Sequence, residues 1–112
     1  MGIQNQVRAV GVDVLRRRAI PMGDKRAYAA GSGCCPGGSV PIECGWCDAP
    51  ARMCWDLDRK IRLTNFFEWD HWLPVALGGH SRLGNILPTC RTCNRWKRDK
   101  HPRVFAREVF AE

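Results

Sequence analysis

Two pairs of cysteines, each pair separated by two residues, are the clearest chemical feature of this sequence: Cys44 with Cys47, and Cys90 with Cys93. Each pair can present two thiolates to one ion, and two pairs complete the tetrahedral four-thiolate shell that Zn²⁺ favours. A zinc ion held in this way would join two distant parts of the chain and contribute folding free energy directly. Four unrelated buried cysteines, or two redox-active pairs, are the alternative interpretation.

A second set of motifs lies between the two cysteine pairs and continues through the second pair. It comprises Asp70-His71-Trp72-Leu73-Pro74, Gly78-Gly79-His80, Asn85-Ile86-Leu87-Pro88 and Cys90-Arg91-Thr92-Cys93-Asn94-Arg95-Trp96-Lys97. In this order and at these spacings, the residues resemble the signature of the HNH endonuclease family over roughly residues 44–100. The resemblance implies an α+β fold, namely a small ββα-metal, treble-clef-like domain with zinc-bound CxxC pairs and flanking N- and C-terminal helices.

The resemblance also implies roles in phosphodiester hydrolysis for four residues. His71 is the expected general base, because a neutral imidazole accepts a proton near pH 7. Asp70 and Asn94 are expected to supply a carboxylate and an amide oxygen to a catalytic divalent ion, Mg²⁺ or Mn²⁺, which prefers oxygen ligands. Asn85 is expected to hydrogen-bond the backbone of the long loop and so hold the base in place. Taken singly, each of these residues could instead cap a turn or be a satisfied buried side chain.

The two neighbouring residues Asp70 and His71 place a condition on the fold. Consecutive residues of a regular strand face opposite sides, so both can serve one site only if the strand ends or bends there. Pro74 and the glycines after it predict that end. Asn94 is expected near the start of a helix that the second cysteine pair opens, so that the zinc site would also position a ligand of the catalytic metal.

Positive charges follow the second cysteine pair and continue from the expected metal site. The candidate nucleic-acid-binding residues are Arg91, Arg95, Lys97, Arg98, Lys100 and, in the preceding loop, His80. The net charge of +7 favours a polyanionic partner, nucleic acid before an anionic membrane surface. Contacts of this kind support sequence-independent binding to phosphates. A solvated helix face is the alternative interpretation of the same charges.

Patterns of apolar residues, glycine and proline predict the elements around these motifs. We expect an amphipathic helix over 4–18 and, in a segment over 23–42 rich in Gly, Ser and Pro, a loop at 31–38. Further on we expect short strands over 55–57 and 61–69 with a turn at 58–60, a loop over 73–84, a short strand at 86–87, a helix within 90–100 once the cysteine pair is passed, and a helix over 102–111. Residues 1–42 are therefore interpreted as an N-terminal helix and loop extension, and residues 43–112 as an HNH nuclease domain.

Length and composition limit the number of domains and the expected cellular compartment. A chain of 112 residues suits one main domain, and no apolar run approaches the roughly 20 residues needed to cross a bilayer. With no signal-peptide core in its first 20 residues, we expect a cytoplasmic protein, where clustered cysteines bind metal rather than form disulfides. The other cysteines, Cys34, Cys35 and Cys54, are expected to be small apolar residues, with Cys34 or Cys35 as competing ligands.

Together these features predict a metal-dependent HNH endonuclease that nicks or cuts double-stranded DNA. A zinc-ribbon-like nucleic-acid-binding module without catalysis, and an RNA-directed nuclease, are the alternatives. The chain resembles the small free-standing HNH endonucleases that phages and mobile elements encode. The resemblance therefore implies a phage packaging protein or another protein as a further partner. The sequence does not decide the oligomeric state or the specificity of cleavage.

Overall fold

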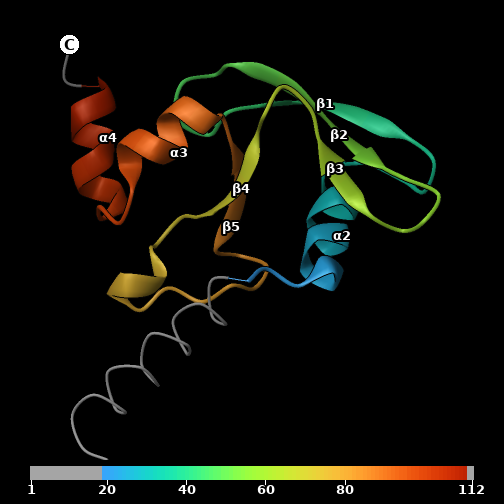
Figure 1. Cartoon of the computed structure of the whole chain (residues 1–112), viewed down its shortest axis with the longest axis horizontal. Coiled ribbons are helices and arrows are strands. Elements are labelled where there is room, and N and C mark those ends of the chain that lie inside the picture. The colour runs from blue at the N-terminus through green and yellow to red at the C-terminus, as the bar shows by residue number, and fades with distance from the viewer. Residues whose placement is uncertain (1–18, 111–112) are drawn as a thin grey trace, which may run out of the picture.

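The computed structural model describes residues 19–110, so the helix expected over residues 4–18 lies outside the described part. The elements follow the chain in the order shown in Figure 1. They are α2 (Met22–Gly31), β1 (Ser39–Glu43), β2 (Pro50–Trp55), β3 (Ile61–Leu63), β4 (Glu68–His71), the 3-10 helix η1 (Val75–Leu77), β5 (Ile86–Thr89), α3 (Arg91–Lys97) and α4 (Pro102–Phe110). No helix within residues 19–110 is both long and apolar enough to cross a membrane.

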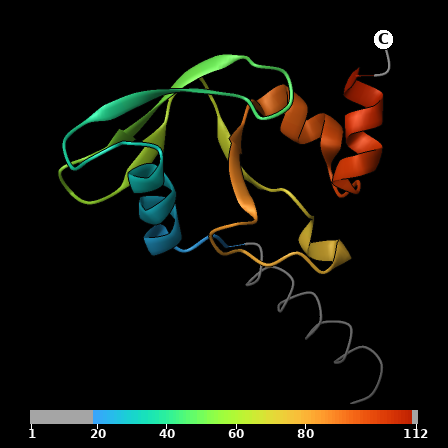
Figure 2. The ribbon, with the colours of Figure 1, turned by 180° about the vertical axis from the view of Figure 1, so that it is seen from behind.

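Two small antiparallel sheets organise the described residues. The first has the order β1-β2-β3, and the second pairs β4 with β5, so that Asp70 lies opposite Leu87 and His71 opposite Ile86. Helix α3 begins two residues after β5 ends, which completes a β4-β5-α3 unit. Figures 1 and 2 show this unit in the middle of the molecule, with α4 at one end and α2 with the three-stranded sheet at the other. The predicted small α+β, ββα-type fold is therefore confirmed.

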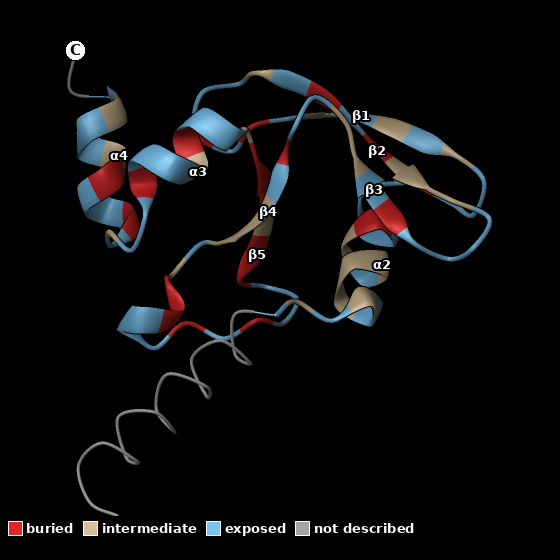
Figure 3. Cartoon of the chain, viewed as in Figure 1, coloured by how far each residue is buried: buried red, intermediate tan, exposed pale blue. Residues whose placement is uncertain are grey.

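Two apolar clusters hold the elements together, and Figure 3 shows where the buried residues lie. One cluster joins the cysteine turns to the C-terminal helices, and in it the Trp46 ring packs edge-on against Phe105 at 4.9 Å between centroids. The other joins α2 to the three-stranded sheet through Ala29, Met53 and Ile61. The first cluster positions the cysteines, and the second ties the N-terminal part of the described chain to the fold.

The loop predicted at 31–38 is confirmed for residues 32–38, but the interpretation of the flanking residues of the Gly-rich segment as loop was wrong. Residues 22–31 form α2, and residues 39–43 form β1. Tertiary packing outweighs the low helix propensity of glycine here, because Ala29 is fully buried and the glycines fall only at the two ends of α2. The domain boundary expected after residue 42 falls inside β1, which pairs with β2 on both sides of that point.

Three strands were predicted where the structure has five: β1 was missed, and the other predictions were shifted or merged. The strand expected over 55–57 is β2, which ends at Trp55, and Leu57 lies in the turn that follows. The strand expected over 61–69 is broken, because Asn65 and Phe66 have φ values of 57° and 58° and carry the chain from one sheet to the other. Helix α3 stops at Lys97, earlier than expected, because Arg98 has a φ of 52°.

Candidate active site and metal centre

The end of β4 opens on a cleft of about 290 Å³. Strand β4 ends at His71, as the motif required, and Asn94 comes from α3. The cleft is lined by Trp69, Asp70, His71, Pro74, Val75, Asn94, Arg98 and Asp99. Asp70, His71 and Asn94 are thus brought together from two elements, whereas Asn85 and His80 do not line the cleft.

The Asp70 carboxylate is half-buried, and its two oxygens have different surroundings. Oδ1 accepts a 2.8 Å hydrogen bond from the backbone N–H of His71. Oδ2 lies 3.5 Å from the Lys97 ammonium but has no hydrogen-bond partner within the described residues. Burial raises the pKa of the Asp70 carboxyl, and the nearby Lys97 charge opposes that shift. A buried carboxylate oxygen that lacks a hydrogen bond fits a cation, and the amide oxygen of Asn94 is a second ligand of the kind that Mg²⁺ or Mn²⁺ takes.

Lys97 requires a correction, because it was expected to contact nucleic acid. Its side chain is fully buried, and its ammonium donates a 2.9 Å hydrogen bond to the backbone carbonyl of His71 while pairing with Asp70. A side chain without exposed surface cannot reach a phosphate in solution. Lys97 instead supports the two site residues at the end of β4 from behind.

The His71 ring is held by a residue that the sequence analysis did not single out. Its Nε2 atom lies 2.8 Å from the Ser81 hydroxyl, and Ser81 is itself buried. Asp99, which also lines the cleft, was likewise not proposed as a site residue. Both residues lie in irregular segments where no periodicity indicates which way a side chain points, so the sequence carried no signal for either.

Asn85 connects the two arms of the long loop through its side chain. Its Oδ1 accepts from the backbone N–H of Leu73 at 2.8 Å, and its Nδ2 donates to the carbonyls of Leu73 at 3.0 Å and His80 at 2.7 Å. A backbone hydrogen bond of 2.9 Å from Trp72 N–H to the Asn85 carbonyl adds to these contacts. Asn85 therefore holds the backbone of the loop that follows His71 at two places, Leu73 and His80.

The four cysteines of the two CxxC pairs form one cluster. The sulfur atoms of Cys44, Cys47, Cys90 and Cys93 all lie within 4.8 Å of one another, and those of Cys47 and Cys90 are 3.6 Å apart. Tetrahedral Zn–S bonds of about 2.3 Å place sulfur atoms about 3.8 Å apart, so the cluster fits zinc. Burial, together with the neighbouring thiols, raises the pKa of Cys93, a cost that a cation at the centre would offset.

The remaining cysteines take no part in this cluster. The Cys34 thiol is buried and lies 3.7 Å from the Gly38 carbonyl and 3.8 Å from the Met53 carbonyl, while Cys35 is exposed. Neither belongs to the group of cysteines that could hold a metal ion. The hypothesis that Cys34 or Cys35 competes as a ligand is therefore not supported by the geometry.

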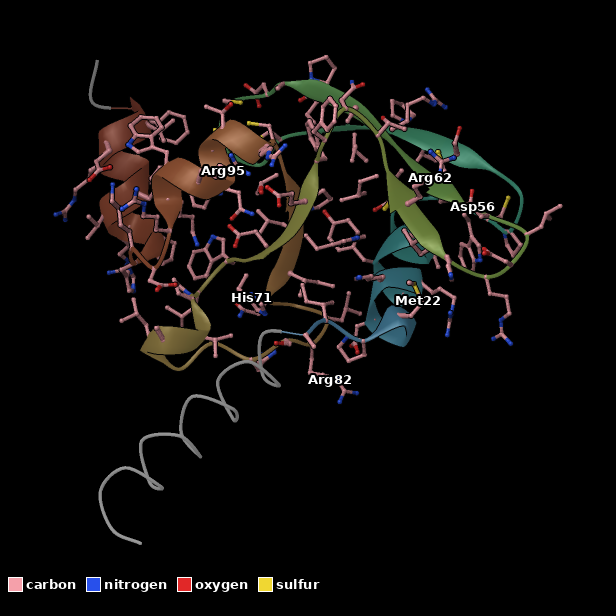
Figure 4. All side chains as sticks on the ribbon, viewed as in Figure 1. Met22, Asp56, Arg62, His71, Arg82 and Arg95 are labelled. Carbon is pink, nitrogen blue, oxygen red and sulfur yellow. The ribbon has the colours of Figure 1, made fainter. Side chains whose placement is uncertain are left out.

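The other candidate nucleic-acid-binding residues lie at the surface. Arg91, Arg95 and Arg98 are exposed on or just after α3, and Arg98 also lines the cleft. Lys100 pairs with Glu108 at 2.6 Å, so part of its charge is already compensated. His80 is exposed, and its Nδ1 accepts a 3.1 Å hydrogen bond from the Arg82 N–H. Figure 4 shows Arg95 on α3 and His71 at the end of β4.

These elements define a small ββα domain with a cysteine cluster that could hold a metal ion such as zinc. Residues 58–110 match a protein-family model described as HNH endonuclease, which supports the resemblance that the sequence motifs indicated. The match runs from the β2–β3 turn to the end of α4, so Cys44 and Cys47 lie outside it. No curated protein and no solved structure matches the chain significantly. The match to this family implies a nuclease hydrolase that acts on nucleic acid.

Proposed function

We propose that this protein is a metal-dependent endonuclease that hydrolyses phosphodiester bonds of DNA, by nicking or double-strand cleavage. The observation that carries the proposal is the meeting of Asp70, His71 and Asn94 in one cleft, although they come from two different elements. A module that only bound nucleic acid would have no need for a base, a carboxylate and an amide oxygen side by side.

Each of these side chains has one chemical task in the proposal. The His71 imidazole removes a proton from the attacking water, a task that neutral imidazole side chains perform near pH 7. The Asp70 carboxylate and the Asn94 amide oxygen would hold the divalent ion, and this oxygen donor set favours Mg²⁺ or Mn²⁺. The bound ion would stabilise the charge that develops on the phosphate oxygens.

The four-cysteine cluster has a different task, namely to hold a structural zinc ion. All four ligand positions would be filled by sulfur, which leaves no open position for substrate or water. Cys90 and Cys93 frame the first turn of α3, and Asn94 follows directly. Zinc bound there would keep α3, and with it Asn94, in place against β4.

The exposed arginines of α3 support nucleic acid as the substrate. Arg91, Arg95 and Arg98 extend from the cysteine cluster to the cleft, where they can neutralise successive phosphates. Contacts to phosphates do not distinguish double-stranded DNA from RNA. Cleavage of matched DNA and RNA substrates by the same preparation decides between the two.

A plasmid-nicking assay tests the proposal. Zinc-loaded protein is incubated with supercoiled DNA, with and without Mg²⁺ or Mn²⁺, beside the variants His71→Ala and His101→Ala. His101 is an exposed histidine near the start of α4 and serves as the matched control. We expect metal-dependent nicking that His71→Ala lowers by about 100-fold or more and that His101→Ala retains. Folded, zinc-loaded protein that cuts neither DNA nor RNA would favour the binding module instead.

A further inference from the structure

The β2–β3 turn, residues 56–60, ends a two-stranded ribbon and has a fixed backbone. The Asp56 N–H donates to the Lys60 carbonyl, and the Arg59 N–H donates to the Asp56 carbonyl, both at 2.9 Å. The Asp58 carboxylate accepts from the Lys60 N–H at 3.2 Å. Helix α2 holds the turn from outside, because the Arg26 guanidinium donates a 3.0 Å hydrogen bond to the Arg59 carbonyl. The turn therefore presents its side chains from one defined backbone position.

Arg59 has an unfavourable backbone conformation within this turn. Its φ is 75°, in the left-handed region, where glycine meets no steric cost but a residue with a Cβ atom does. Glycine at this position would therefore make the turn easier to form. A strained residue that is also exposed points to a task of its side chain rather than to a gain in stability.

The turn exposes two cations that form no ion pair within the described part of the chain. They are Arg59 and Lys60, and both are exposed. The Asp56 carboxylate is already paired, with the Arg62 guanidinium at 3.3 Å. The Asp58 carboxylate accepts a hydrogen bond from the turn itself. The two cations can therefore pair with an anion from outside the chain.

An apolar side chain lies beside these cations. Leu57 is 88% exposed, the most of any large apolar side chain within residues 19–110. Together with Trp55 it lines two surface hollows, of about 490 and 280 Å³, so it forms a ridge between them. Single exposed leucines are common on protein surfaces, but this one lies at the end of a rigid ribbon beside two cations.

Duplex DNA fits this combination of side chains. Its major groove admits a two-stranded ribbon, cations neutralise the phosphates along its edges, and an apolar side chain can contact the thymine methyl group. Figure 4 shows Asp56 and Arg62, on the two sides of the turn, far from His71 and Arg95 in the view. A contact at the turn would therefore hold DNA outside the cleft, in addition to the arginines of α3.

We propose that the β2–β3 turn is a second DNA-binding surface, which contacts duplex DNA beside the segment that lies in the cleft. Arg59 and Lys60 pair with phosphates, and Leu57 packs inside the major groove. The inference rests on the proposed function, because it takes duplex DNA as the substrate. It also gives a role to α2, outside the residues that match the HNH family model, since Arg26 of that helix holds the turn.

The first test measures the binding of a labelled DNA duplex of about 20 base pairs, by fluorescence anisotropy at several salt concentrations. Zinc-loaded protein carrying His71→Ala is used without Mg²⁺, so that no strand is cut. We expect Arg59→Gly to weaken binding about 3- to 10-fold and to reduce the salt slope by about 0.9, the loss of one phosphate contact. The melting temperature should stay equal or rise, because glycine relieves the strain at a φ of 75°. An unchanged salt slope overturns the proposal.

Arg52→Gln is the matched control for the loss of one charge. Arg52 is an exposed cation of β2, and its guanidinium donates to the Ser39 hydroxyl at 3.0 Å. The change in net charge is the same as in Arg59→Gly, but we expect the salt slope of the parent protein. An equal loss in both variants would assign the effect to net charge and overturn the proposal.

Leu57→Ala tests the groove contact separately. We expect weaker binding at every salt concentration with an unchanged salt slope, because an apolar contact releases no counterions. Binding that stays as tight as in the parent, or that is no tighter to the duplex than to a single strand, overturns the groove contact.

These binding measurements need no turnover, so the two proposals can fail separately. A protein that binds duplex DNA through the turn but cuts no DNA would remove the proposed function and keep this surface. A protein that cuts DNA while Arg59→Gly binds like its parent would keep the function and remove the surface.

Discussion

The Lys97 ammonium donates a 2.9 Å hydrogen bond to the backbone carbonyl of His71 and lies 3.5 Å from Oδ2 of Asp70, with no part of the lysine side chain exposed. One buried cation thus contacts both residues at the end of β4. Charges are buried in this way only when they are paired, because the loss of hydration costs several kcal/mol per ion.

The first prediction concerns this pair. Lys97→Met removes the charge but keeps most of the volume, and it leaves the half-buried Asp70 without its partner. We expect the free energy of unfolding of the zinc-loaded protein to fall by about 3 kcal/mol, measured by urea denaturation. Lys100→Met is the control, since the Lys100–Glu108 pair is about one-third exposed and is expected to contribute less than about 1 kcal/mol. Equal small losses in the two variants would contradict the structural role of Lys97.

The second prediction concerns the side chain of Asn85. Asn85→Asp keeps an acceptor for the Leu73 N–H but replaces the amide that donates to the Leu73 and His80 carbonyls. Because a carboxylate would then face two carbonyl oxygens, we expect a loss of about 2–3 kcal/mol in stability. We also expect a fall in kcat of at least about 10-fold.

Asn65→Asp is the matched control for this change. Asn65, between β3 and β4, donates one exposed hydrogen bond of 2.9 Å to the Pro50 carbonyl at the start of β2. The loss there is expected to stay near 1 kcal/mol, with kcat unchanged. If Asn85→Asp kept the wild-type kcat, the loop would not be what orients His71.

The third prediction concerns Gly79, which lies beside the hydrogen bonds of Asn85. A Cβ atom at this position would overlap the Leu73 carbonyl oxygen and lie 2.9 Å from Asn85 Nδ2. We expect Gly79→Ala to lower the melting temperature by several degrees and to reduce nicking. Gly23→Ala is the control, because a Cβ in that position of α2 meets open space and alanine favours the helix. A Gly79→Ala variant as stable as Gly23→Ala would show that the loop backbone can move aside.

The fourth prediction concerns the cysteine cluster. We expect one zinc ion per chain by elemental analysis, and loss of the folded state when a chelator removes it. Cys93→Ser is expected to lower the zinc content and the stability together, whereas Cys35→Ser, at an exposed cysteine outside the cluster, is expected to change neither. Nicking by a zinc-free protein would contradict the claim that the ion keeps α3 and Asn94 in place.

The spacing of the sequence motifs was enough to predict which polar groups meet. The CxxC pairs converge, and Asp70, His71 and Asn94 share one cleft, because each motif lies at the end of a strand or at the start of a helix. The ends of strands and the starts of helices depend on local residues such as proline and glycine, which can be identified directly in the sequence.

What the sequence did not predict depends on the tertiary packing. Lys97 ends the motif and also stands in a run of positive charges, but neither position predicts its burial, because that burial depends on β4 packing against α3. Ser81 lies in an irregular loop, where its contact with His71 depends on the hydrogen bonds of Asn85. Helix α2 was missed because its glycines suggested a loop, while its stability comes from contact with the three-stranded sheet.

The separation between the two cysteine pairs has a consequence for the order of folding. Cys47 and Cys90 are 43 residues apart, so the four sulfurs meet only after a long loop has closed. Each doubling of loop length adds about 0.6 kcal/mol to that entropic cost, whereas the β2–β3 hairpin closes over a short turn. The hairpin is therefore expected to form early, and capture of the metal by all four sulfurs to be a late step. The rate of zinc uptake by the unfolded chain should then follow the rate of loop closure rather than the concentration of zinc.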